Sequence, residues 1–358
     1  MDCWIGNINN VPRILNDNQL DVINSRLETI KFPKSQLRLM PTFTTKSKIT
    51  PKWKAIEYEL FLTYGFLCLE DMLPRVYFNN FVKLVKIIST LTKRSISVKE
   101  DIIPTNRLIT DFLREFHQIY SLYAHRFNVH LLTHMAEITF EFGPLYVSSS
   151  YIVENSIGLL VKKIKTSNLV QEQIINKILS SSSVLSSFLS DQTRFSELAN
   201  NFILEMFPSL KKPNIQNIVI PSTSDTKVFL SPNEKTLLKE FQSSFSSAKF
   251  YQKILVKDFR ITTDKYSSSF ARANCFIKSE NKFFKIIKII FFEDINKLCF
   301  LGKRYEIEQE NYLGLHYVHK TSNQRTIELV NPDQIQSNFT IFSSSLGAFI
   351  LEITNRYI

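Results

Sequence analysis

The pattern of apolar residues changes at a proline-rich segment, and this change limits the fold more than any other feature of the chain. Before about residue 205, apolar residues recur every three or four positions, as in amphipathic helices. After residue 235 they alternate or form short β-branched and aromatic runs, as in strands. The segment between holds Pro208, Pro213, Pro221 and Pro232. The sequence predicts an α+β protein, with an all-α helical domain followed by a small β-rich barrel or sandwich.

Four divisions of the chain follow from this pattern. Residues 1–50 are predicted to be a polar N-terminal segment and connector that includes one helix over 18–30. The other divisions are a helical domain (51–205), a linker (206–235) and a small β-rich domain (236–358). The strands expected in the last division cover 253–262, 282–292, 298–307, 312–319, 326–330 and 348–354.

Composition excludes several classes of protein. Of 358 residues, 44% are hydrophobic and 30 are Phe, which is typical of a folded chain and not of a disordered one. The 7 Gly form no phosphate-binding loop motif, and the 4 Cys show neither C-x-x-C spacing nor disulfide density. No signal peptide or long apolar stretch is evident. We expect an intracellular protein with no membrane segment and no evident small-molecule substrate.

The charge balance favours an anionic partner. The chain carries 44 basic and 33 acidic residues, a net charge of +11. Lys282, Lys285 and Lys288 recur among aromatic and β-branched residues, a pattern that fits either a nucleic-acid platform or a sheet edge protected by lysines. A second group, made up of Lys162, Lys163 and Lys165, fits either phosphate contacts or a solvated helix face.

Three further residues could carry chemistry. His130 and His134 lie four positions apart on one predicted helix, so both imidazoles share a face and could hold a metal. Structural histidines are the more common explanation of that spacing. Glu154 opens a later helix, where a carboxylate usually interacts with free amides and the helix dipole.

An ordered series of five motifs runs from Trp53 to Gly158. It starts with Trp53-Lys54-Ala55-x-Glu57-Tyr58-x-x-Phe61-Leu62. The motifs that follow in order are Leu73-Pro74 with Phe81, Asn128-x-His130-x-x-x-His134, Gly143-Pro144-Leu145, and Tyr151-Ile152-Val153-Glu154-Asn155-Ser156-Ile157-Gly158. In this order they resemble the C-terminal half of transposases of the CACTA (En/Spm) type and of their host-gene relatives. The resemblance covers Trp53 to Gln173, about 120 residues.

The resemblance implies an RNase H-like nuclease in which three acids hold two divalent metals that act on a phosphodiester. By its motif position, Glu154 is the candidate for the third acid, with His130 and His134 as supporting residues. Glu154 would bind a metal only if the other acids came from elsewhere. The resemblance also implies a nuclear location, with DNA and transposase-related proteins as partners.

The sequence departs from the family in ways that bear on catalysis. The strands that should carry the earlier acids precede the Trp53 motif in relatives, whereas only about 50 mostly non-strand residues precede it here. Ile152 and Ile157 replace the expected Pro and Asn. We therefore expect a transposase-derived protein with an incomplete, RNase H-like catalytic core that binds DNA or protein, with no enzymatic activity and no cofactor of its own.

Two alternatives stay open at this point. The chain could be the C-terminal part of an active metal-dependent DDE-type DNA transposase. Its activity would then be Mg-dependent strand cleavage and transfer, with the missing acids on another polypeptide. It could also be a protein-interaction scaffold.

Overall fold

The computed structural model describes residues 14–33, 39–43, 53–120, 127–148, 168–190, 230–239, 248–256, 259–270, 272–292 and 297–353, with a few single residues and pairs outside these ranges. The chain forms two compact units. The first combines Met1–Pro144 with Ile218–Ile358, and the second is Leu145–Asn217.

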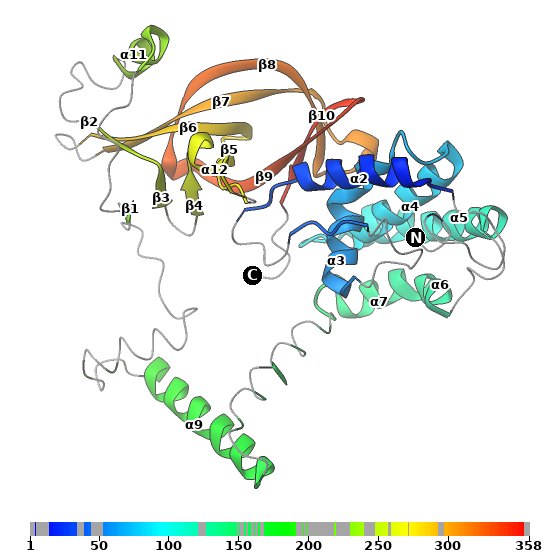
Figure 1. Cartoon of the computed structure of the whole chain (residues 1–358). Helices are drawn as coiled ribbons and strands as arrows, with labels where there is room; N and C mark the ends of the chain where they lie inside the picture. Colours follow the sequence, from blue (N-terminus) through cyan, green and yellow to red (C-terminus); the bar gives the residue numbers. More distant parts are fainter. Residues whose placement is uncertain are drawn as a thin grey trace. The chain divides into compact units, whose positions relative to one another are not determined.

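The N-terminal part of the first unit is helical (Figure 1). Short π and 3-10 turns connect several of the helices, as at Phe61–Gly65 and Val98–Ile102. The α-helices are α2 (Asp17–Thr29), α3 (Ala55–Leu60), α4 (Arg75–Leu91), α5 (Ile103–Ile119), α6 (Phe127–Leu131) and α7 (Met135–Phe142).

Local sequence signals explain where these helices begin and end. Asn16 caps α2 in a reciprocal capping box with Gln19. Ser97 accepts a hydrogen bond from the Glu100 amide at 3.3 Å, as expected of a cap. In a capping box the amide of Ser97 would donate to the Glu100 side chain. It donates to Asp101 at 2.9 Å, because the first turn is a π turn and shifts the acceptor by one residue. Gly143, with φ of 85°, ends α7.

The C-terminal part of the first unit is built mainly of strands. Two short helices, α11 (Pro232–Lys239) and α12 (Asp264–Ser267), accompany them. The strands are β1 (Ile218–Val219), β2 (Ala248–Tyr251), β3 (Lys253–Val256), β4 (Phe259–Thr262), β5 (Phe276–Ser279), β6 (Lys282–Phe292), β7 (Lys297–Gln309), β8 (Val318–Val330), β9 (Ile335–Ser344) and β10 (Gly347–Glu352).

Six of these strands close into an antiparallel barrel. Their order is β6-β5-β9-β10-β8-β7, and β7 pairs back with β6 to complete the ring. Closure removes the free sheet edges that would otherwise invite pairing with another chain. β2 adds to β6 outside the ring, while β1, β3 and β4 form a separate three-stranded sheet.

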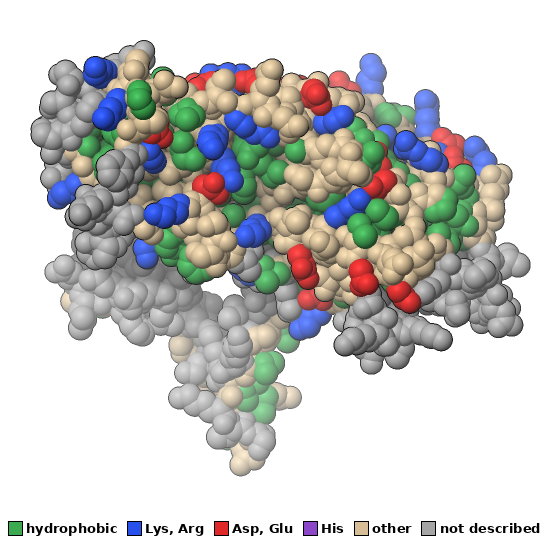
Figure 2. All heavy atoms as spheres, turned by 45° about the horizontal axis from the view of Figure 1, so that its top comes forward, with side chains coloured by type: hydrophobic (Ala, Val, Ile, Leu, Met, Phe, Trp, Pro, Cys, Tyr) green, Lys and Arg blue, Asp and Glu red, His purple; other side chains and the backbone are tan. Residues whose placement is uncertain are grey.

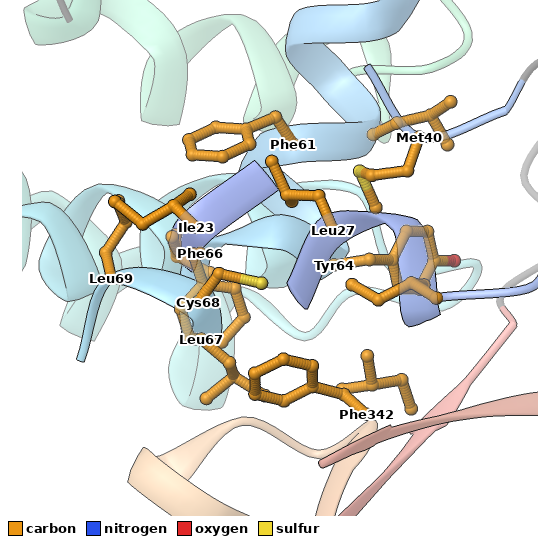
Figure 3. Close-up of a cluster of buried hydrophobic side chains, with 14 of the residues drawn as sticks. Ile23, Leu27, Met40, Phe61, Tyr64, Phe66, Leu67, Cys68, Leu69 and Phe342 are labelled. Carbon is orange, nitrogen blue, oxygen red and sulfur yellow. The ribbon is translucent and has the colours of Figure 1, made fainter. Parts of the chain in front are cut away.

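One apolar core joins the helical part to the barrel. Phe342 on β9 and Phe349 on β10 are fully buried, and they belong to the same cluster as Leu27 of α2 and Leu67. Figure 3 shows Phe342 on the strand side of this cluster, below Leu67 and Cys68. The helices thus cover the β9–β10 side of the barrel, as Figure 1 shows.

Hydrogen bonds cross the same boundary. The Tyr317 hydroxyl donates to the carbonyl of Thr63 at 2.9 Å, and the Thr340 hydroxyl donates to the carbonyl of Lys31 at 3.0 Å. Asp71 accepts from the Arg26 guanidinium and, at 2.6 Å, from the Ser345 hydroxyl. The Arg26 hydrogen bond outweighs partial burial and, with Ser345, lowers the pKa of Asp71 to about 2.

The α+β prediction, with an N-terminal helical part and a C-terminal barrel, is confirmed. The grouping of the chain differs from the expected divisions, because the helices up to Pro144 and the strands share one core within a single unit. The strand expected over 312–319 is wrong over most of its length, because β8 begins only at Val318. Tyr312–Gly314 form a 3-10 turn, with Asn311 and Leu313 in the left-handed region.

The second unit contributes one long described helix, α9 (Val170–Ser190). This helix lies within the range for which the sequence predicts continued helical structure. The expected linker, 206–235, lies largely outside the described residues. Among the helices that are described, none has the length and apolar character needed to span a bilayer.

We predict that Phe342→Ala destabilises the protein by about 3–5 kcal/mol, because it opens a cavity in the joint core. Urea unfolding followed by far-ultraviolet circular dichroism measures the loss. Phe270→Ala is the matched control, since Phe270 lies in the β-rich part but is 49% exposed, and it should change stability by less than about 1 kcal/mol. Equal losses for the two variants would contradict the joint core.

Candidate functional site

Glu154, the candidate third acid, lies in the second unit and is exposed. A site for two metals needs several carboxylates converging from different elements. Among the residues that the structure describes, no three His, Cys, Asp or Glu side chains come close enough to hold a metal ion. The described residues therefore do not fit the divalent-metal site that the resemblance implies, and we derive no catalytic step through a metal.

The two candidate supporting histidines lie in the first unit. His130 is on α6 and His134 is on the 3-10 turn before α7, and both are exposed. Their rings make an edge contact with centroids 5.3 Å apart, and His134 Nδ1 lies 3.6 Å from a Glu137 carboxylate oxygen. This local arrangement provides two imidazoles and one nearby acid on the surface.

The candidate phosphate contacts Lys162, Lys163 and Lys165 lie outside the described residues. The other three candidate lysines are well described, and each forms an ion pair within the chain. Lys282 Nζ lies 3.4 Å from Glu328, Lys285 Nζ 2.9 Å from Asp264, and Lys288 Nζ 2.6 Å from Glu234. Their charges are therefore partly neutralised, which lowers their value as phosphate contacts.

The Lys288–Glu234 pair is the most buried of the three. The Glu234 side chain is only 7% exposed, and its carboxylate also accepts the Ser231 amide at 2.7 Å. Burial alone would raise the pKa of Glu234, but the hydrogen bonds from Lys288 and Ser231 outweigh it and lower that pKa. The pair holds α11 against β6 of the barrel.

Sequence reasoning missed a polar cluster inside the barrel. Side chains alternate across a strand, so the β10 residues that do not face the helical core, Ile350 and Glu352, face the barrel interior. Glu352 accepts from His319 Nε2 of β8 at 3.0 Å and from Lys278 Nζ of β5 at 3.0 and 3.1 Å. Phe283 of β6 packs against the His319 ring, with centroids 5.4 Å apart.

Both partners act on the charge of Glu352. Burial would raise the pKa of this carboxyl, but the hydrogen bonds from His319 and Lys278 outweigh burial and hold it below its usual range. No local signal in the sequence identifies this cluster, because positions 278, 319 and 352 meet only when the barrel closes. Predicting this cluster would require the register of the barrel strands, which the sequence does not specify.

The surface carries charges of both signs. Figure 2 shows basic, acidic and apolar side chains interspersed on the face that it presents.

Comparison with known proteins adds no identification, since no family model, curated protein or solved structure matches this chain.

We predict that Lys288→Met costs about 3 kcal/mol of stability, because it leaves the buried Glu234 carboxylate without its cation. Lys282→Met is the matched control on the same strand. It should cost at most about 0.5 kcal/mol, because Lys282 is 40% exposed and Glu328 keeps its pair with Arg304. Thermal unfolding of both variants checks this, and a larger loss for Lys282→Met would refute it.

Proposed function

We propose that this chain is a transposase-derived protein that works by binding another protein and does not catalyse DNA cleavage by itself. The ordered motifs from Trp53 to Gly158 support the origin. The proposal that the protein does not cleave DNA rests on one observation about Glu154. This residue is exposed, and among the described residues no three acidic or other ligand side chains come together to hold a metal ion. The family chemistry needs all three acids.

Exposed apolar side chains support a protein partner. Phe127 on α6 is 72% exposed, and Phe140 and Phe142 on α7 are 62% and 65% exposed. Exposed apolar side chains can serve as contacts for another protein, and these three lie within 16 residues of one another along the chain. The partner class that the resemblance implies is a transposase-related protein.

DNA binding is the second candidate, favoured by the net charge of +11. It is weaker because Lys282, Lys285 and Lys288 are each paired with a carboxylate. Fluorescence anisotropy with a DNA duplex at several salt concentrations distinguishes DNA binding from binding to a protein alone. An affinity that falls steeply with salt would favour DNA contacts.

We predict that the purified protein neither nicks nor joins DNA with Mg²⁺ or Mn²⁺. The measurement is a strand-cleavage and strand-transfer assay, with an active CACTA-type transposase on the same substrate as positive control. Robust cleavage that Glu154→Gln abolishes would overturn the proposal, because it would show that Glu154 acts within a complete metal site.

We also predict that the double change Phe140→Ser and Phe142→Ser weakens binding to a CACTA-type transposase by at least about tenfold, since it removes exposed apolar contact area. Isothermal titration calorimetry measures the affinity. Val22→Ser on α2 is the control, because Val22 is also exposed, at 42%, but lies outside α6 and α7. Absence of binding by the unchanged protein, or equal affinity for both variants, would count against a protein-binding role.

A further inference from the structure

The loop between β7 and β8, residues 310–317, touches both the barrel interior and the helical part. On one side, the amide of Asn311 donates to His319 Nδ1 at 3.4 Å. On the other side, the Tyr312 hydroxyl donates to Glu70 Oε1 at 2.8 Å, and the Tyr317 hydroxyl donates to the Thr63 carbonyl at 2.9 Å. The loop is therefore the segment through which the interior cluster meets the helices.

The conformation of this loop depends on its contacts. Asn311 (φ 51°) and Leu313 (φ 55°) both adopt the left-handed region, which asparagine tolerates but leucine rarely occupies. Such conformations persist only when surrounding interactions hold them. Loss of one holding contact should therefore open the loop more readily than it would an unstrained turn.

The hydrogen bonds of His319 assign its neutral form. Its Nε2 faces the Glu352 carboxylate, which only accepts, so Nε2 carries the proton. Its Nδ1 faces the Asn311 amide, which only donates, so Nδ1 must be unprotonated. A protonated imidazole has donors at both nitrogens and cannot accept that amide.

We propose that His319 is a proton-sensitive latch for residues 310–314 at the start of this loop, which stay closed while the imidazole is neutral and open when it takes up a proton. The charged groups that face the ring are Glu352 of β10 and, through Glu352, Lys278 of β5. From β6, the uncharged Phe283 packs against the ring. On β8, the neighbouring Lys320 pairs with Glu308 of β7.

The two sides of the ring respond differently to a proton. The contact with Glu352 gains attraction, because a cation then faces a carboxylate. The contact with Asn311 turns from a hydrogen bond into an opposition of two donors. Opening would also release Tyr312. Burial and the adjacent Glu70 raise the pKa of Tyr312 to about 12, so its hydroxyl remains a donor throughout the range in which histidine titrates.

Hydrogen exchange of the full-length protein, read by mass spectrometry at pH 8 and pH 5.5, tests the latch. Protection of residues 310–314, normalised to intrinsic exchange rates, should fall about fivefold at the lower pH, as expected for the loss of one hydrogen bond. Leu315 and Tyr317, which are buried in the joint core, should keep theirs. Residues 75–91 of α4 should keep their protection. His319→Asn is the matched variant, because the amide oxygen occupies the place of Nδ1 and accepts at both pH values.

The proposal is overturned if residues 310–314 keep their protection at pH 5.5, or if His319→Asn loses protection to the same extent. Nitrogen-15 shifts of the histidine rings provide a second measurement on the unaltered chain, which does not require a variant to fold. At pH 8, His319 should be the tautomer protonated at Nε2. A proton on Nδ1 at that pH would also overturn the latch, because the Asn311 amide would then have no acceptor there.

Discussion

The apolar core that joins α2 and α3 to β9 and β10 is the interaction on which the rest of the structure depends. Phe342 and Phe349 bring the barrel wall into the same cluster as Leu27 and Leu67, and all four are almost completely buried. Burial on this scale is the main favourable term in folding. Because one face of β9 and β10 serves this core, the opposite face is left for the barrel interior, where Glu352 meets its partners.

Several charged side chains that the sequence makes prominent form ion pairs within the chain. The lysines of β6 that resemble a nucleic-acid platform in sequence each face a carboxylate brought from α11, α12 or β8. Inside the barrel, Glu352 satisfies both His319 and Lys278. These pairs leave the net charge of +11 unchanged, but the three lysines of β6 do not supply its unpaired part. The lysine pattern of β6 therefore gives little support to DNA binding, and we favour the proposal of binding through exposed apolar side chains.

Local signals predicted helices and several strands, whereas β5 and β9 of the barrel lie outside the predicted strand ranges. Long-range pairing decided which of these elements meet. The caps at Ser97 and Gly143 and the periodic apolar residues of α4 are short-range features, and the helices follow them. The ion pairs of β6 could not be predicted, because Lys288 and Glu234 lie 54 residues apart and meet only through the register of the barrel. The same holds for His319 and Glu352, which come from different strands.

Native-state hydrogen exchange over a series of urea concentrations tests the joint core most directly. If the helices and the barrel depend on one core, the slowest amides of α4 and of β9 should open with the same free energy and the same urea dependence, since both are lost in one cooperative step. A clearly lower opening free energy for α4, with β9 still protected, would contradict the account.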